Sequence, residues 1–313
     1  MSKADKYFKD MCRNILSTEN QKYKVRPHWE DGTQAYVIKN FGICTTYDLR
    51  EEFPAITIRK TAIKSAADEI LWIYQKKSNN INDLNSHIWD EWANKDGSIG
   101  KAYGYQIGKK TIHTKLDKTK FRDNDYIQEL MSMYKKYPSF YADTNTGDVF
   151  MDQMDSVLYD LSNDPYSRRI MTNLWNVSEL HEMNLQPCAY SCTFNVCNEE
   201  GYDKPILNLL LNQRSQDILA ANNWNVVQYS ILLMMVAQVS DMIPGKLMHV
   251  ISDSHIYDRH IPIIKELIER HEHKAPIVKL NPEIKNFYDF TVSDIIVEDY
   301  ETEPQIKNIP IAI

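Results

Sequence analysis

Residues 225–240 form a stretch that is apolar on nearly every face of a helix, although it includes Gln228 and Gln238. The stretch is too short to span a bilayer. A helix of this kind needs cover from other segments on all sides, and we expect Pro244 and Gly245 to end it. It therefore predicts a large core built around one enclosed helix.

The rest of the chain mixes helical and extended patterns. The clearest helix covers residues 61–75, where Ile63, Ala66 and Ile70 repeat at helical spacing. Residues 108–150 are polar instead, and we expect a surface insertion there. Without repeats or linkers, the pattern predicts one domain of the α/β (α+β) class over 1–313, with an insertion at about 108–150. Further helices are expected at 5–16, 125–136, 151–162 and 261–271, and strands at 35–49, 169–175, 190–196 and 247–252.

Charge and cysteine content disfavour several classes of protein. The 43 acidic residues outnumber the 36 basic ones, and this net charge of −7 disfavours nucleic-acid binding through bulk charge. The five cysteines include no CxxC pair, so we expect neither a disulfide framework nor a zinc or other metal site. Free thiols, with no apolar leader and no membrane-spanning stretch, predict a cytoplasmic protein.

Cys188, in the segment QPCAY, is the first candidate for chemistry. A lone cysteine is most often an inert buried thiol. It becomes reactive where a neighbour such as an arginine stabilises its thiolate. A pairing with His255 would instead suit a hydrolase, but no sequence rule fixes that pairing.

Two groups of arginines could bind an anion. Arg214 is followed by Ser215 and Asp217, which could hold an anionic ligand with it or form a solvated turn with an internal ion pair. Arg168 and Arg169 enter an expected strand and would point to opposite faces, so one would face inward or across an interface. The alternative for this pair is a basic surface patch.

Three further features are consistent with a ligand site. The polar segment 253–260 follows an expected strand, where α/β proteins often bind ligands, although a capped loop would fit equally. Asn225 opens the apolar helix and is either an N-cap or an amide that reads a base edge. Glu69 lies on the shoulder of an apolar helix face, half-buried or at the rim of a cleft, which makes it a candidate acid with a raised pKa.

Taken in order, the motifs of this chain resemble the thymidylate synthase family. The resemblance covers nearly all of the sequence except 108–150 and 197–205. It implies a large mixed buried sheet with surrounding helices, and a homodimer in which two such sheets pack back to back. The motifs are EILWIYQ, HIWDEWA, GKAYGYQ, SRRIMTNLWNV, LQPCAY, LNQRSQD, NWNVVQY, PGKLMHVISDSHIYDRH and IKNIPIAI.

The resemblance implies reductive methylation of dUMP to dTMP, with 5,10-methylenetetrahydrofolate as co-substrate and dihydrofolate as the second product. Cys188 would add to C6 of dUMP and make C5 nucleophilic. Glu69 would organise water for proton transfers, and Tyr103 would assist removal of the C5 proton. The implied catalytic residues are Cys188, Glu69, Tyr103, Arg214, Asn225 and Asp217.

The resemblance also implies two sets of binding residues. Arg168 and Arg169 would reach the phosphate in the partner subunit's site, and Asn225 would read uracil and so favour dUMP over dCMP. The implied dUMP-binding residues are Arg26, Arg168, Arg169, Arg214, Ser215, Asp217, Asn225, His255 and Tyr257. The implied folate-binding residues are Trp89, Trp92, Asp217, Ala221 and Ile313, whose carboxylate would close over the folate.

Two positions depart from the family pattern. Ala189 stands where many members carry histidine, and Ala221 stands where a glycine is common. Two rival functions stay open: a dUMP hydroxymethylase of the same superfamily, which Trp89 disfavours, and a catalytically silent nucleotide-binding homologue.

Overall fold

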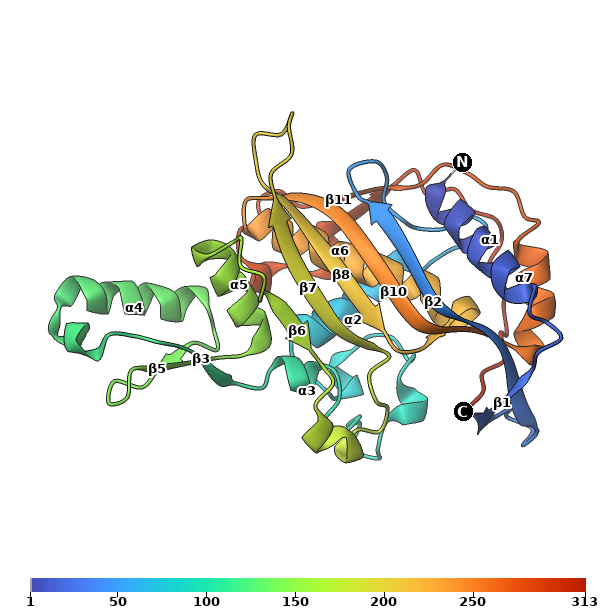
Figure 1. The fold of residues 1–313 in the computed structure, drawn as a ribbon, viewed down its shortest axis with the longest axis horizontal. Helices are drawn as coiled ribbons and strands as arrows, with labels where there is room; N and C mark the ends of the chain where they lie inside the picture. The colour runs from blue at the N-terminus through green and yellow to red at the C-terminus, as the bar shows by residue number, and fades with distance from the viewer. Residues whose placement is uncertain (1) are drawn as a thin grey trace.

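A seven-stranded mixed sheet organises the chain in the computed structural model, which describes residues 2–313 (Figure 1). The strand order is β1-β2-β10-β8-β7-β6, and β9 pairs with β10. β10 is parallel to β8 and β9, whereas the other pairs are antiparallel. The strands are β1 Tyr23–His28, β2 Gln34–Asp48, β6 Met171–Asn173, β7 Ala189–Cys197, β8 Ile206–Gln213, β9 Gln216–Asp217 and β10 Ile243–Tyr257.

Helices cover one face of this sheet. α2 and α6 pack against each other, and Figure 1 shows them behind the strands. The enclosed helix expected at 225–240 is confirmed as α6, whose residues are buried on nearly every side. The helices are α1 Lys3–Leu16, α2 Ile63–Tyr74, α3 Gly104–Ile107, α4 Asn124–Lys136, α5 Gln153–Asn163, α6 Asn223–Val239 and α7 Ile261–Leu267. Shorter turns of helix are Ile81–Asp83, Asp90–Trp92, Lys118–Arg122, Val177–Glu182, Ile218–Asn222, Asp258–His260, Phe287–Asp289 and Val292–Asp294.

The end of α6 differs from the prediction. The helix stops at Val239, and Asp241 adopts a left-handed backbone with φ of 54°. Pro244 and Gly245 then lie inside β10 rather than in the turn. A Cβ on Gly245 would come within 2.4 Å of Ile206, so glycine permits β10 to approach β8 this closely.

Several predicted strands and helices differ in length from the observed elements. The strand expected at 169–175 is only Met171–Asn173, and the helix expected at 261–271 ends at Leu267. The strand expected at 247–252 runs from Ile243 to Tyr257. β8 was not predicted, because Asn208 and Asn212 interrupt its apolar sequence on the outward face.

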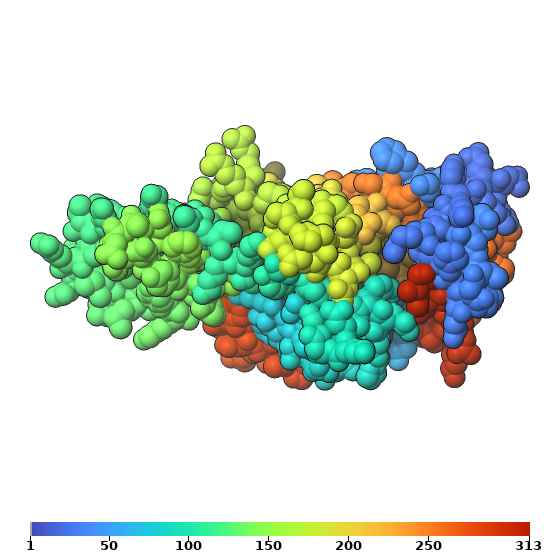
Figure 2. All heavy atoms as spheres, turned by 90° about the horizontal axis from the view of Figure 1, so that it is seen from below, coloured from blue at the N-terminus to red at the C-terminus, as the bar shows by residue number. Residues whose placement is uncertain are grey.

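Residues 108–150 extend away from the main sheet. They contain a small antiparallel sheet of order β3-β5-β4 together with α4, and Figures 1 and 2 show this region protruding at one end of the molecule. The helix predicted at 125–136 is confirmed as α4. The remaining strands are β3 Thr111–Lys115, β4 Tyr141–Ala142, β5 Asp148–Met151, β11 Ile277–Leu280 and β12 Ile295–Glu298.

Among residues 2–313, no helix covers the central strands on the second face of the main sheet (Figure 1). Met248 on β10 is 38% exposed and Met171 on β6 is 47% exposed. Phe41 on β2 is 90% exposed. Within residues 2–313, none of the helices has the length and apolar character needed to cross a membrane. The mixed α/β class and the large mixed sheet are confirmed.

Candidate active site

The strand register brings Cys188 and Arg214 together. β7 and β8 are antiparallel with Ala189 opposite Gln213, so the residue before β7 lies beside the residue after β8. The Arg214 backbone N–H donates to the Cys188 carbonyl at 3.0 Å. The guanidinium donates to the Pro187 carbonyl at 3.0 Å, and its Nη2 lies 3.7 Å from the Cys188 Sγ. The sheet therefore fixes a positive charge against the thiol.

Two opposing effects act on the Cys188 thiol. Burial raises its pKa, and the charge of Arg214 offsets part of that rise. The arginine that could activate this cysteine is therefore in place beside the thiol.

Tyr103 occupies a constrained turn above the cysteine. Its φ is 46°, and a Cβ on the following Gly104 would come within 2.1 Å of the Ser78 carbonyl. The Tyr103 hydroxyl accepts a hydrogen bond from the Cys188 N–H at 3.3 Å. Its ring packs edge-on against Trp89, with the centroids 4.9 Å apart. The turn therefore holds a phenol between the thiol and an aromatic wall.

Glu69, on α2, is more deeply buried than expected, with 5% of its surface exposed. Its carboxylate accepts hydrogen bonds from the indole N–H groups of Trp89 at 2.9 Å and Trp224 at 2.5 Å. Burial raises the pKa of Glu69 to about 7, although the hydrogen bonds from Trp224 and Trp89 oppose the rise. The expected raised pKa is confirmed, and this carboxyl can give or take a proton near neutral pH.

Asn225 lies in the first turn of α6 rather than at its N-cap, because the helix begins at Asn223. The N-cap alternative is therefore wrong. The Asn225 Oδ1 accepts hydrogen bonds from Gln213 and Gln216, each at 3.3 Å. Its Nδ2 donates to the Gln228 Oε1 at 2.9 Å. The side-chain amide is therefore held with a defined acceptor end and a defined donor end.

The end of β10 carries a second polar cluster. β9 places Asp217 opposite His255, whose Nδ1 lies 2.9 Å from an Asp253 carboxylate oxygen. The Asp217 carboxylate lies 3.6 Å from the His260 Nδ1. Burial raises the pKa of Asp217, but the nearby His260 and His255 rings and the backbone N–H of Ala220 outweigh burial, so the net shift is downward. Burial raises the pKa of Tyr257 to about 12, and the nearby Asp217 adds to the rise.

Arg26 and Ser215 are the remaining residues implied to bind the phosphate. Arg26 is exposed on β1, and it is close enough to Tyr257 for its charge to oppose the rise in the tyrosine pKa. Ser215 is half-buried between Arg214 and β9. Ser215 and Arg214 are therefore adjacent in the chain beside the thiol, whereas Arg26 lies near Tyr257.

Arg168 and Arg169 lie elsewhere in the same chain. They precede β6 in an exposed turn, not in the strand that was expected. The backbone of the next residue, Ile170, bonds to Phe194 on β7. Phe194 is six residues from Cys188 along the strand, or about 20 Å. Within one chain, these two arginines are therefore not brought to the thiol.

The other residues implied to contact a folate surround Trp89 and Asp217. Trp92 is half-buried and packs edge-on against Trp89, with centroids 5.8 Å apart. Ala221 is half-buried in the helical turn Ile218–Asn222 that follows Asp217.

The C-terminal residues are tied to the N-terminal hairpin. The backbone N–H and C=O of Ile313 both bond to His28, at 2.9 and 2.8 Å. The His260 Nε2 donates to the Pro310 carbonyl at 2.8 Å. His260 therefore links Asp217 to the tail.

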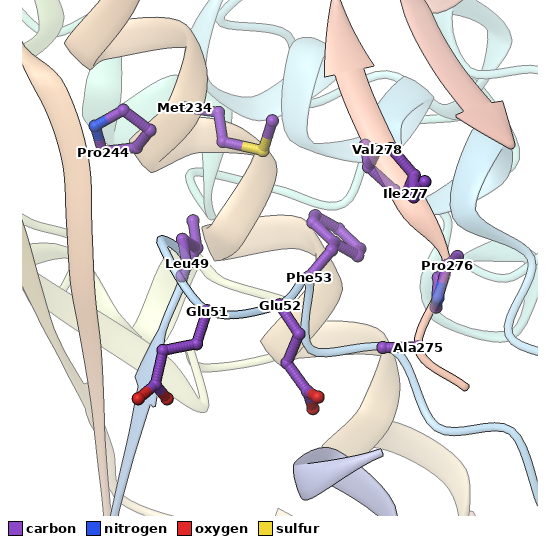
Figure 3. A pocket seen from close by; sticks show the side chains of 10 residues that line it. All are labelled: Leu49, Glu51, Glu52, Phe53, Met234, Pro244, Ala275, Pro276, Ile277 and Val278. Carbon is purple, nitrogen blue, oxygen red and sulfur yellow. The ribbon is translucent and has the colours of Figure 1, made fainter. Parts of the chain in front are cut away.

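The main cavity at the other end of the sheet has a different character (Figure 3). It has a volume of about 270 Å³, and Phe53, Met234 and Pro244 line it together with Glu51 and Glu52. Pro244 lies at the start of β10, whereas His255 and Tyr257 lie at its end. This cavity is therefore separate from the polar site. Within residues 2–313, no three His, Cys, Asp or Glu side chains are grouped to hold a metal ion.

Several residues of the site were missed by sequence reasoning. Gln213 directly precedes Arg214, and Gln228 is one helical turn after Asn225, so both could have been found by spacing. Trp224 meets Glu69 across 155 positions of sequence, and no local pattern indicates that contact.

Known proteins with this arrangement were found by sequence and by structure. The thymidylate synthase family model matches residues 6–312. Thymidylate synthase 1 of Bacillus subtilis strain 168 is 36% identical over 307 residues, covering 96% of each chain, and the thymidylate synthase of Bacillus phage phi3T is 35% identical with the same coverage. The solved structure of thermostable thymidylate synthase A from Bacillus subtilis matches with a TM-score of 0.80 at 34% identity, covering 99% of each chain. The chain belongs to the thymidylate synthase family.

Proposed function

We propose that this chain converts dUMP to dTMP with 5,10-methylenetetrahydrofolate and releases dihydrofolate. The observation that carries the proposal is the Arg214 guanidinium held 3.7 Å from the Cys188 Sγ. This pairing supplies a nucleophile and a fixed cation at one point, which a phosphorylated pyrimidine requires.

Cys188 is the proposed nucleophile. Its sulfur forms a bond to C6 of the uracil, and the electron pair of the C5–C6 double bond moves toward C4 and O4. C5 thereby becomes the carbon that attacks the one-carbon unit. The phosphate group of dUMP is assigned to Arg214, Arg26 and Ser215, and the ribose 3′-hydroxyl to His255 and Tyr257.

Asn225 is the proposed reader of the base. Its Oδ1 would accept from the uracil N3–H, and its Nδ2 would donate to O4. The side-chain oxygen Oε1 of Gln216 is buried and has no hydrogen-bond partner among residues 2–313. This oxygen could accept a hydrogen bond from a ligand, which supports a polar ligand beside Asn225.

Glu69 and Tyr103 are the proposed proton-transfer residues. The pKa of about 7 at Glu69 supports transfer in both directions at neutral pH. The Tyr103 hydroxyl, fixed by the Cys188 N–H, is assigned to the path by which the C5 proton leaves.

The folate is assigned to the side formed by Trp89, Trp92, Asp217 and Ala221. When bound, the folate supplies the one-carbon unit and the hydride. The two indole rings offer an apolar wall, and Asp217 offers a carboxylate for ring N–H groups, so these residues fit a pterin. The Ile313 carboxylate is assigned to closing the site, and Trp89 to excluding water.

The proposal includes a homodimer of one-domain chains, with residues 108–150 as an insertion, in the cytoplasm. The uncovered sheet face, with Met248 and Met171 exposed, supports back-to-back packing of two sheets. Arg168 and Arg169, which are exposed in their own chain, are assigned to the phosphate in the partner's site. Light scattering should give twice the 36.7 kDa chain mass.

A product assay tests the proposed reaction. Purified protein is mixed with dUMP and methylenetetrahydrofolate, dihydrofolate is followed by absorbance, and the nucleotide is identified by mass. The proposal expects dTMP and dihydrofolate in equal amounts. Hydroxymethyl-dUMP without dihydrofolate would identify a hydroxymethylase instead, and nucleotide binding without product would identify a silent homologue.

A further inference from the structure

A buried chain of side chains runs from β10 through β8 to α6. It consists of His249, Gln213, Asn225 and Gln228, and we call it the amide chain. His249 bonds to the Gln213 Oε1, the Gln213 Nε2 donates to the Asn225 Oδ1 at 3.3 Å, and the Asn225 Nδ2 donates to the Gln228 Oε1 at 2.9 Å. His249 is 0% exposed, and Gln213 and Gln228 are each 1% exposed.

The β-sheet places His249 on the inward face. β10 alternates, so Leu247, His249 and Ile251 point to the core while Met248 is exposed. Ile251 is the residue opposite Gln213 on β8, which puts His249 within reach of the Gln213 side chain. Neither His249 nor Gln228 belongs to the residue set proposed above for substrate binding or catalysis.

The direction of donation within the amide chain is set at its ends, and Gln216, which also donates to the Asn225 Oδ1 at 3.3 Å, favours the same Asn225 orientation. Each side-chain amide carries a donor end and an acceptor end, so reversing one amide forces its neighbours to reverse as well. Burial lowers the pKa of His249 to about 3, so the imidazole is neutral and carries one N–H. With this proton on Nε2, His249 donates to the Gln213 Oε1, and the Gln213 amide must then donate to Asn225.

The other end of the amide chain favours the same direction. The Gln228 Oε1 accepts from Asn225, while its Nε2 is buried without a hydrogen-bond partner among residues 2–313. The Gln228 amide opposes the rise in the pKa of Glu69, and a reversed Gln228 would present its carbonyl oxygen to that carboxylate instead, which is unfavourable. The Glu69 end is therefore compatible with the same direction, and His249 is the end that makes a direct hydrogen bond.

The direction of donation decides which base fits. Uracil presents an N3–H donor and an O4 acceptor, whereas cytosine presents an N3 acceptor and an N4 donor. An Asn225 amide of one orientation complements uracil, and the reversed amide complements cytosine.

We propose that His249 is a positioning residue that, through Gln213, fixes the orientation of the Asn225 amide and so sets the preference for uracil over cytosine. This inference rests on the proposed function, because it assigns the preference to the same nucleotide site. His249 touches no substrate in this account and acts only through Gln213.

The test is the ratio of dCMP to dUMP dissociation constants, measured by calorimetry. His249→Leu removes the donor and should lower this ratio about tenfold, mainly by weakening dUMP binding, with little change in kcat. His249→Asn can still donate to Gln213 and should recover most of the ratio. Tyr74→Phe is the matched control, because it removes a buried hydroxyl that bonds to Thr172 outside the amide chain, and it should leave the ratio unchanged.

The outcomes separate this inference from the proposed function. Failure of the unaltered protein to bind dUMP would count against the proposed function. Normal dUMP binding with an unchanged ratio in a folded His249→Leu protein would overturn the role of His249.

A second measurement needs no variant, in case His249→Leu does not fold. Nitrogen NMR of protein labelled at its nine histidines reports the proton position on each ring. The inference requires the Nε2–H form of neutral His249 at pH 6 to 8. Finding the proton on Nδ1 would overturn it.

Discussion

The two ends of β10 present opposite kinds of environment. At the end near His255, carboxyl, amide and imidazole groups are buried or half-buried. Burial there raises the pKa of Glu69 to about 7. At the end near Pro244, a cavity of about 270 Å³ is lined mainly by apolar side chains (Figure 3). The proposed site residues therefore coincide with the buried polar groups whose pKa values are shifted, and not with this cavity.

The carboxylates beside the cavity have ordinary structural partners. Glu51 pairs with Lys3 at 2.5 Å, and Glu52 accepts hydrogen bonds from Ser2 and from the backbone at the start of α1. Such contacts satisfy the carboxylates and tie α1 to the sheet. Glu69 instead accepts direct hydrogen bonds from two indoles, with the Gln228 amide nearby, and no salt bridge among residues 2–313 includes it, so its charge remains costly.

The largest effect is expected at the polar end. Cys188→Ser should lower kcat by at least about 10⁴-fold, because a hydroxyl is a far weaker nucleophile than a thiolate. Binding of dUMP should change little, since Arg214 and Asn225 remain. Stopped-flow turnover and calorimetry measure the two quantities. A parallel loss of dUMP binding would contradict the nucleophile role.

Glu69→Gln should lower kcat by about 10²- to 10⁴-fold, because it removes the group that exchanges protons near pH 7. The folded pKa of Glu69 is raised, so its ionisation costs stability as the pH rises from the unfolded pKa of 4.5 to about 7. The cost is at most about 3 kcal/mol above pH 7. Melting temperatures at pH 5.5 and 8 should therefore differ less in the variant than in the unaltered protein, and equal differences would argue against the raised pKa.

Asn225→Asp should shift the preference from dUMP toward dCMP by about 10- to 100-fold, because a protonated or hydrated carboxyl can complement the cytosine edge. Competition binding with both nucleotides measures the shift. A variant that still prefers dUMP to the original degree would rule out base reading by this residue.

His260→Asn should alter the pH dependence of folate binding. Burial lowers the pKa of His260, but Asp217 outweighs it, so the folded pKa is raised above 6.5. Its stabilising charge is therefore complete below pH 6.5 and is lost as the pH rises through the raised value. The folate KM of the unaltered protein should rise up to about tenfold on that alkaline side, while the KM of the variant stays flat. If the folate KM of the variant and that of the unaltered protein changed with pH in the same way, the link from Asp217 to the tail would be contradicted.

The cavity end supplies the control with the smallest effect on catalysis. Phe53→Ala removes a ring that is 5% exposed and should lower the free energy of unfolding by about 3 kcal/mol. The dUMP KM and kcat should stay within about twofold at a temperature where the variant is folded. Denaturant unfolding and steady-state kinetics check both, and a large rise in KM would show that the cavity takes part in binding.

Sequence reasoning predicted the enclosed helix α6 and the mixed α/β class, because their patterns are local. The roles of Cys188 and Arg214 came from ordered motifs, but their contact depends on the pairing of Ala189 with Gln213, which no local pattern fixes. The bond between Glu69 and Trp224 is likewise a product of helix packing. Long-range register and packing are what the sequence patterns leave undetermined.

A crystal structure of the Cys188→Ser protein with dUMP tests the central claim most directly. We expect the phosphate at Arg214, the uracil edge at Asn225 and C6 facing residue 188. Nucleotide bound in the cavity beside Phe53 and Met234, with the polar end free of it, would contradict the account.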